Sequence, residues 1–220
     1  MSIDLESLYY HRFAGIDNRP VWKEITRFFN KTGRVSEHES VCDIACGDGE
    51  FLNQIECKRK YGVDLRRSPA LSNEVIFLQK NVLDLCLDDF PGEAPSQFFI
   101  SNFLEHLESK DQISQLLRGI ARILDNARSR RKRVLIMGPN IDYVGSRYWD
   151  FFDHNLPLNA NSVGEALASE GFTVTESIGR FLPFSTKSRL PKDPRLVRAY
   201  LAFPPAWRIL GGQFLITGER

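Results

Sequence analysis

The feature that most constrains the fold is a pair of short apolar runs that each lead to an aspartate. Residues 41–49 read Val-Cys-Asp-Ile-Ala-Cys-Gly-Asp-Gly, and Tyr-Gly-Val-Asp follows at 61–64. The small residues in the first stretch let the backbone approach a ligand closely, because glycine has no Cβ. We therefore predict a strand, a tight turn, a helix over about 49–57 and a second strand. Asp64 would then accept the hydroxyls of a ribose, or alternatively cap a following helix.

Details of this loop separate the nucleotide-binding alternatives. A phosphate-binding P-loop ends in Gly-Lys-Ser/Thr and a dinucleotide fingerprint reads Gly-x-Gly-x-x-Gly, and the loop matches neither pattern. Asp48 and Glu50 also place negative charge where a pyrophosphate requires backbone amides. An acidic mouth favours a cationic ligand, and S-adenosylmethionine carries both a sulfonium and an ammonium group. The loop therefore predicts a site for this nucleoside.

With these residues the chain resembles the class I S-adenosylmethionine-dependent methyltransferases, whose first motif reads roughly Asp-x-Gly-x-Gly-x-Gly. The match is clearest over residues 38–140, with Ala45 in place of the first glycine. The resemblance implies S-adenosyl-L-methionine as the cofactor. It also implies a set of cofactor-binding residues: Asp43, Ala45, Cys46, Gly47, Gly49, Asp64, Leu65, Asn81, Val82 and Asn102.

Asn81 stands where the family usually has an aspartate that meets the adenine amino group, with the backbone amide of Val82 meeting the ring. The carbonyl oxygen of an asparagine can also accept a hydrogen bond from that amino group. Asp84 competes for this role. The remaining alternative is that Asn81 is an ordinary turn residue.

Apolar runs alternate with helical patterns along the chain. Strands are expected near 40–44, 60–64, 75–78, 98–101, 133–137, 172–177 and 213–217, and helices over 113–124 and 160–171. Together with the resemblance, this alternation predicts an α/β fold: a Rossmann-like, doubly wound, mostly parallel seven-stranded sheet with helices on both faces. In such sheets ligands bind outside the carboxyl ends of the strands, where each of these motifs lies.

A single methyltransferase domain is expected over residues 1–220, since this length buries a sizeable core. Residues 1–34 are expected to form a helical lead-in, because apolar residues recur at spacings of three and four: Val21, Ile25, Phe28 and Phe29. Residues 178–212 are expected to form an insertion or cover before the last strand, and 196–201 could supply a helix within it.

Two polar stretches are candidates for the side of the methyl acceptor. Ser-Asn-Phe-Leu-Glu-His occupies 101–106, where the family often has Asn-x-x-Glu-His lining the methionine end of the cofactor. Aromatic residues and acids precede His154, and an imidazole oriented by a carboxylate is a general base for a hydroxyl. The predicted catalytic residues are His154, Asp153, Glu105 and His106, with Asp150 as an alternative support for His154.

Structural roles are the alternatives for these residues. Glu105 and His106 could cap the helix that begins nearby, and the aromatic segment before His154 could be simple core packing. No metal is expected, because no cluster of oxygen ligands appears at a suitable spacing.

Residues 150–158 and 179–191 resemble a bacterial subset of these enzymes associated with surface polysaccharide or glycolipid assembly. This implies O-methylation of a small hydroxylated acceptor, a sugar or glycolipid intermediate. Aromatic residues with Arg180, Lys187 and Arg189 would suit a sugar that bears phosphate. The alternatives are a structural cover, a dimer contact, or peripheral membrane contact through 196–210.

A function of a different class stays open. Because Ala45 and Asn81 depart from the family pattern, the chain could be a catalytically inactive nucleoside-binding subunit of an assembly complex. We expect a monomer or homodimer.

Composition disfavours several partners. The formal net charge of +1 gives no bulk field for nucleic acid, and the basic run 128–133 is interpreted as a solvated loop. The four cysteines lack CxxC spacing and are expected to be reduced, which predicts a cytoplasmic protein. No secretory signal and no apolar run of about 18 residues is visible, so a soluble protein is expected.

Overall fold

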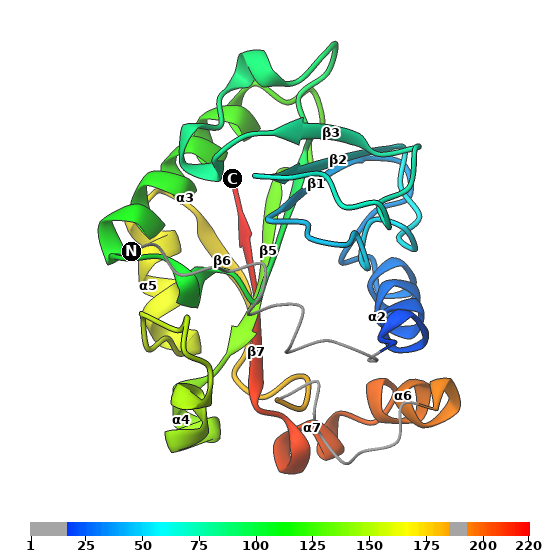
Figure 1. Cartoon of the computed structure of the whole chain (residues 1–220), viewed down its shortest axis with the longest axis vertical. Coiled ribbons are helices and arrows are strands. Elements are labelled where there is room, and N and C mark those ends of the chain that lie inside the picture. The colour runs from blue at the N-terminus through cyan, green and yellow to red at the C-terminus, as the bar shows by residue number, and fades with distance from the viewer. Residues whose placement is uncertain (1–16, 185–192) are drawn as a thin grey trace.

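The computed structural model describes residues 17–184 and 193–220. Its centre is a seven-stranded sheet with the order β3-β2-β1-β4-β5-β7-β6 (Figure 1). The strands are β1 (Ser40–Ile44), β2 (Arg59–Asp64), β3 (Ile76–Gln79), β4 (Gln97–Ser101), β5 (Arg133–Pro139), β6 (Thr173–Ile178) and β7 (Gln213–Glu219). β7 pairs antiparallel with β5 and β6, and the other pairs are parallel. The predicted fold class is confirmed.

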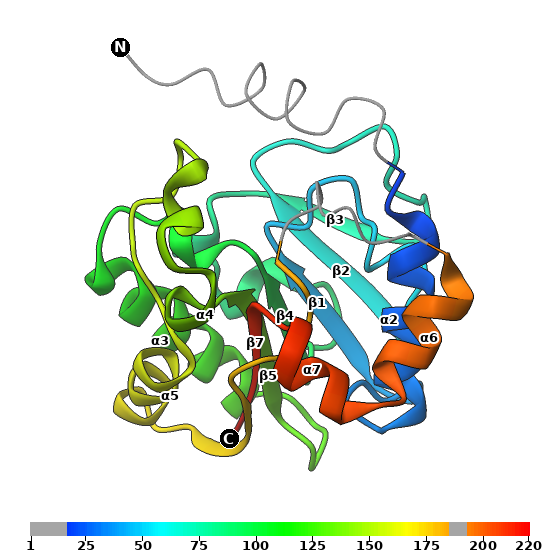
Figure 2. The same ribbon diagram turned by 90° about the horizontal axis from the view of Figure 1, so that it is seen from below.

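Helices cover both faces of the sheet (Figure 1 and Figure 2). One face carries α3 (Lys110–Asp125) and α5 (Ala160–Ser169), and the other carries α2 (Arg19–Lys31), α6 (Pro194–Leu201) and α7 (Pro204–Leu210). The short elements are η1 (Val82–Asp84), η2 (Leu87–Asp89), η3 (Leu104–His106), α4 (Ile141–Val144) and η4 (Gly145–Asp150). Within these residues no helix has the length and apolar character needed to cross a bilayer.

The two hydrophobic cores follow from the alternation of side chains along each strand. In β4, Phe98 and Ile100 pack with α3 and α5, whereas Phe99 packs with α2. All three side chains are almost completely buried. The sheet therefore separates two apolar layers, which explains why its central strands read as continuous apolar runs.

The helix predicted over 49–57 is wrong. After Gly49 the chain makes turns, with Asn53 N donating to Gly49 O at 2.8 Å and Ile55 N to Phe51 O at 2.9 Å. Nine residues separate Gly49 from Arg59, the first residue of β2. As a helix these nine residues would span about 13.5 Å. The connection must return along the whole of β1, whose five residues extend over roughly 16 Å, so a helix would be too short. A more extended path is required.

Segments from both ends of the chain cover the face that this missing helix leaves open. α2 is helical over Arg19–Lys31, with Ile25 and Phe29 buried. It packs against α6, and the Arg198 guanidinium forms two hydrogen bonds of 2.7 and 2.8 Å with the buried Glu24 carboxylate. The described residues of the expected insertion include two helices, α6 and α7, on this face of the sheet.

Most aromatic residues expected to stack on a sugar belong to this cover. Phe181 and Trp207 are buried, with their rings 5.1 Å apart, and Arg180 donates to the carbonyl oxygens of Gly211 and Ile209. These contacts are structural. Lys187 and Arg189 lie outside the described residues, as does the lead-in before residue 17.

Truncation of Phe99 tests the packing of the α2 layer. Its ring lies 4.1 Å from that of Phe51 and 5.9 Å from that of Phe29. We expect Phe99→Ala to lower the free energy of unfolding by about 3–5 kcal/mol, measured by urea denaturation. Phe152→Ala is the control, because this side chain is 75% exposed and its loss should cost less than about 0.5 kcal/mol. Equal losses in the two variants would contradict this packing.

Candidate active site

The predicted site residues meet at one edge of the sheet. β1 lies between β2 and β4, so the chain leaves it in one direction first and returns to build the sheet in the other. Ligands of open α/β sheets bind at such a switch point, outside the carboxyl ends of the strands. Residues 45–49 follow β1, 64–65 end β2, 81–82 follow β3 and 102–106 follow β4.

The loop after β1 adopts a backbone conformation that requires small residues. Ala45, Gly47 and Gly49 have φ angles of 56°, 50° and 72°. In this left-handed region a Cβ costs about 1–2 kcal/mol, and alanine at position 45 bears that cost. Cys46 N donates to Val63 O at 3.1 Å, which attaches the loop to β2.

Asp64 holds this loop in place. Its Oδ2 accepts a hydrogen bond from Gly47 N at 2.9 Å, and its Oδ1 accepts one from Leu65 N at 2.7 Å. A carboxylate offers about four acceptor positions, so two are available for ribose hydroxyls. The alternative role as a helix cap is wrong, because turns and bends follow Asp64 as far as β3.

A second acid lies beneath the loop. Asp43 is buried, and burial raises the pKa of its carboxyl well above the usual range, with the charge of Asp64 adding to the effect. Burial likewise raises the pKa of the Cys46 thiol. Burial thus favours the neutral form of Asp43, and the Asp64 carboxylate is the charge at this end of β1 and β2 that favours a cationic ligand.

Asn81 has a structural contact. Its side-chain oxygen accepts a hydrogen bond from Leu83 N at 3.0 Å and caps η1. The turn role is therefore confirmed, whereas the contact with an adenine amino group stays a prediction. Val82 is buried behind it.

The segment after β4 is also constrained. Asn102 has a φ of 49°, its amide donates to Met137 O at 2.8 Å, and its side chain donates to Ser101 Oγ at 3.0 Å. The proposed capping role of Glu105 and His106 is wrong, because Ser109 caps α3 by accepting from Gln112 N.

Glu105 is almost completely buried, with a residue exposure of 2%. Its carbonyl oxygen accepts from Asn155 N at 2.8 Å and Leu156 N at 3.1 Å, which docks the segment after η4 against η3. Burial raises the pKa of its carboxyl to about 8, and the nearby charge of Asp153 contributes in the same direction.

His106 is oriented by Asp153. Its Nδ1 lies 2.9 Å from the backbone oxygen of Asp153 and 3.3 Å from the side-chain Oδ2. The sequence paired this carboxylate with His154, and the structure adds His106. The two imidazole rings lie 5.1 Å apart, and His154 stacks on Phe151 at 4.9 Å.

The fold forms a cluster that sequence spacing did not reveal. Potential ligand atoms of Glu105, His106 and His154 lie within 4.8 Å of one another. Two of these residues are neighbours, and the third follows 48 positions after His106. The expectation that no metal-ligand cluster forms rested on spacing along the chain, and the docking of residues 151–156 against η3 creates this one.

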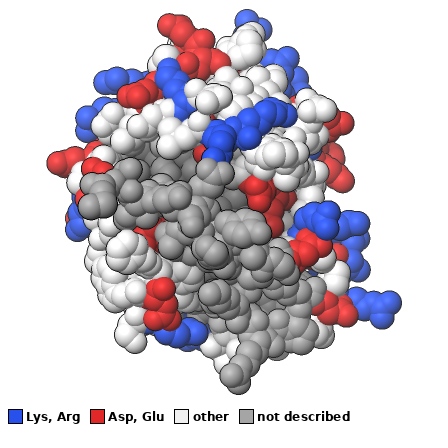
Figure 3. Space-filling view, viewed as in Figure 1, with Lys and Arg blue, Asp and Glu red and all other residues white. Residues whose placement is uncertain are grey.

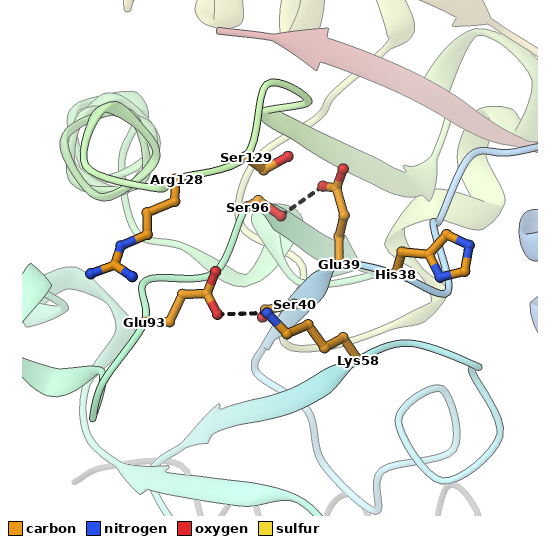
Figure 4. Close-up of a pocket in the computed structure, with 8 residues that line it drawn as sticks. All are labelled: His38, Glu39, Ser40, Lys58, Glu93, Ser96, Arg128 and Ser129. Atoms are coloured by element: carbon orange, nitrogen blue, oxygen red, sulfur yellow. Dashed lines mark hydrogen bonds and ion pairs between the residues drawn. The ribbon is translucent and has the colours of Figure 1, made fainter.

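A separate surface hollow of about 310 Å³ lies at the opposite edge of the sheet (Figure 4). It is next to Ser40 and Ser96, near the amino ends of β1 and β4, and contains the Lys58–Glu93 ion pair of 2.9 Å. Arg128, from the basic run, also borders it. Because ligands of this fold class bind at the carboxyl ends, we do not assign the hollow as the active site.

Charge is distributed without a dominant sign over the described surface of the face in Figure 3, where basic and acidic side chains alternate around the rim. This distribution agrees with the net charge of +1 and offers no continuous basic track for a phosphate backbone there.

Comparison with solved structures supports the fold. No protein-family model matches the sequence, and no curated protein sequence matches it. The chain is similar to an S-adenosylmethionine-dependent methyltransferase from Archaeoglobus fulgidus (TM-score 0.62, 19% identity, covering 99% of this chain and 100% of that one). It is also similar to the N-methyltransferase NodS from Bradyrhizobium japonicum WM9, solved with S-adenosyl-L-homocysteine (TM-score 0.61, 14% identity, covering 98% and 97%).

A third similar structure is a chain from a Haloferax volcanii complex between the Trm112 methyltransferase activator and a putative methyltransferase (TM-score 0.63, 19% identity, covering 97% of this chain and 94% of that one). These similarities extend over nearly the whole length of each chain. They show that this chain has the fold of S-adenosylmethionine-dependent methyltransferases.

Alanine substitution of two left-handed glycines tests the loop. Gly33 and Gly49 have φ angles of 69° and 72°, and a Cβ would meet nothing within 4 Å at Gly33 but lie 2.3 Å from Leu71 Cδ1 at Gly49. We expect Gly33→Ala to cost about 1–2 kcal/mol and Gly49→Ala about 1–3 kcal/mol more in urea denaturation. Equal costs would contradict the tight packing of the loop.

The raised pKa of Asp43 predicts a pH-dependent stability difference. An acid whose pKa is higher in the folded state contributes stability below its unfolded value, about 3.9, and loses it as the pH rises through the folded value. Asp43→Asn should therefore gain stability relative to the parent as the pH increases above about 4. Urea denaturation across pH 4–8 measures this, with the exposed Asp88→Asn as the substitution control. A constant difference across the range would contradict the burial effect.

Proposed function

We propose that this protein binds S-adenosylmethionine and transfers its methyl group to a hydroxyl of a small acceptor, a sugar or glycolipid intermediate. The observation that carries the proposal is the hydrogen bond from Gly47 N to Asp64 Oδ2 at the switch point of the sheet. This hydrogen bond joins a glycine-containing loop, whose backbone a ligand can approach closely, to an aspartate that can accept hydrogen bonds from ribose hydroxyls.

The residues present fit this cofactor. Leu71 occupies the space that a Cβ at position 49 would need, so the loop backbone is packed in place before any ligand arrives. Asp64 has acceptor positions left for ribose hydroxyls. The Asp64 carboxylate would supply negative potential for a ligand with sulfonium and ammonium groups. Val82 and Asn81 would border the adenine, and Asn102 the methionine end.

The bound cofactor would supply a methyl group already activated by the positive sulfur, so the protein's task is alignment. Holding acceptor and methyl donor in line can remove up to about 7–11 kcal/mol from a barrier. The rigid segments after β1 and β4 suit this task because backbone hydrogen bonds hold both of them to neighbouring strands.

The polar cluster after β4 would serve the acceptor. A hydroxyl must lose its proton as it is methylated, and imidazoles are effective bases near neutral pH. His154 is assigned as this base, with His106 and Glu105 beside it. Asp153 acts as a positioning residue through its two contacts with the His106 ring.

Exposed side chains of α6 and α7 support a glycolipid as the acceptor. Apolar side chains on and between α6 and α7 face solvent: Leu196, Phe203, Ile209 and Leu210 are 53%, 59%, 75% and 47% exposed. Arg195 and Arg208 on the same helices are exposed as well. Apolar and basic side chains together would suit an acyl chain and an anionic headgroup, which also keeps peripheral membrane contact within the proposal.

Thermal unfolding with S-adenosylmethionine tests cofactor binding. A ligand at 100 times its dissociation constant adds about 2.7 kcal/mol, which for this chain length should raise the midpoint by roughly 5–10 °C. Asp64→Asn should lose most of this shift, whereas the exposed Glu74→Gln should keep it. NAD and ATP serve as ligand controls. The absence of a shift at millimolar cofactor would overturn the proposal.

Transfer of a labelled methyl group to sugars, sugar phosphates and glycolipids then tests the chemistry. We expect label in a hydroxyl of one of these classes, and at least about a 100-fold lower rate in His154→Gln with an unchanged cofactor shift. Cofactor binding without transfer to any of them would instead support the catalytically inactive subunit.

A further inference from the structure

We propose that Glu105, His106 and His154, after the carboxyl end of β4, form a binding site for a divalent transition-metal ion. The three residues converge from two segments, η3 and the chain after η4, and their ligand atoms lie within 4.8 Å of one another. Two imidazole nitrogens and one carboxylate oxygen are the donors preferred by ions such as Zn²⁺ and Co²⁺.

The orientation of His106 favours metal binding. The backbone oxygen of Asp153 can only accept a hydrogen bond, so Nδ1 of His106 carries the proton at this 2.9 Å contact. The lone pair is therefore on Nε2. Metal-binding histidines characteristically donate their other ring nitrogen to a carbonyl or carboxylate, which fixes the tautomer and the ring. Asp153 supplies both groups, with its Oδ2 at 3.3 Å.

Glu105 supplies an independent observation. Its side chain is almost completely buried, and the influences on its carboxylate are burial, its own backbone amide and the like charge of Asp153. Within residues 17–184 and 193–220, no lysine or arginine forms an ion pair with it. Buried carboxylates are normally paired with a cation or coordinate a metal, and a bound ion would provide that positive charge.

The geometry requires a closing movement of the side chains. Tetrahedral bonds of about 2.1 Å place ligand atoms about 3.4 Å apart, so the widest pair must approach by up to about 1.4 Å. Rings around the site restrain larger changes, since His154 packs against Phe151 at 4.9 Å and Tyr148 at 4.8 Å.

Three protein ligands leave a coordination position open, as in catalytic rather than structural metal sites. An acceptor hydroxyl bound there would lose its proton more readily, because a metal ion lowers the pKa of a coordinated oxygen. With the ion bound, His154 would be a ligand and not the base, and the proton of the hydroxyl would pass to solvent. This role rests on the proposed function, whereas binding of the ion does not.

Metal titration of the full-length protein tests the site directly and uses no cofactor or acceptor. After treatment with EDTA and dialysis, Zn²⁺ binding is measured by calorimetry and Co²⁺ binding by visible absorption. We expect one ion per chain for the parent. Glu105→Gln and His154→Gln should each weaken binding by more than about 100-fold, beyond the 10–100-fold typical of losing an outer-shell partner.

His38→Gln is the matched control, because this histidine has a side-chain exposure of 84% and lies away from the cluster. It should bind like the parent. Circular dichroism and thermal unfolding confirm that each variant is folded. Failure of the parent to bind, unchanged binding in both cluster variants, or equal affinity for Mg²⁺ would overturn the assignment. Near-ultraviolet thiolate absorption with Co²⁺ would also overturn it, by placing the ion on cysteine.

If S-adenosylmethionine raises the unfolding midpoint but the protein binds no metal, the proposed function stands and this metal site is overturned. If the protein binds metal but S-adenosylmethionine does not raise the midpoint, the metal site stands and the proposed function is overturned.

Discussion

The contact between Gly47 and Asp64 organises the ligand edge of this protein. It ties the loop after β1 to the end of β2, and the pairing of Cys46 N with Val63 O reinforces the same junction. Because glycine loses more conformational freedom on folding than other residues, an external partner helps to hold Gly47 in its left-handed conformation. Asp64 provides that partner, and its carboxylate has acceptor positions left for a ligand.

The layer of the fold that contains α2 is built without a regular helix between β1 and β2. The connection from β1 to β2 is too short for a regular helix, so its apolar residues Phe51 and Leu52 pack directly on the sheet. α2 and α6, distant in sequence, complete the layer and are joined by the Glu24–Arg198 ion pair. Because this layer is built from segments far apart in the chain, its stability depends on long-range packing.

After the carboxyl end of β4, one docking contact brings several titratable side chains together. The backbone oxygen of Glu105 receives two amides from the segment after η4, which brings Asp153 and His154 against η3. Burial then places carboxylates and imidazoles together in a region of reduced solvation, where their mutual charges act strongly. A base for a hydroxyl and a ligand of a metal ion are alternative roles for His154, because an imidazole nitrogen bound to a metal cannot also accept a proton.

The sequence by itself determined the sheet, its strand positions and the ligand edge, because apolar runs and small residues at strand ends reflect local backbone requirements. The position of Asp64 at the end of β2 could be predicted for the same reason. Only the tertiary structure decided that residues 49–57 form no helix, since this depends on the distance between two strand ends. It also placed Asp153 against His106 and buried Phe181 and Trp207 in the cover. These outcomes depend on contacts between segments far apart in the chain, which local patterns do not encode.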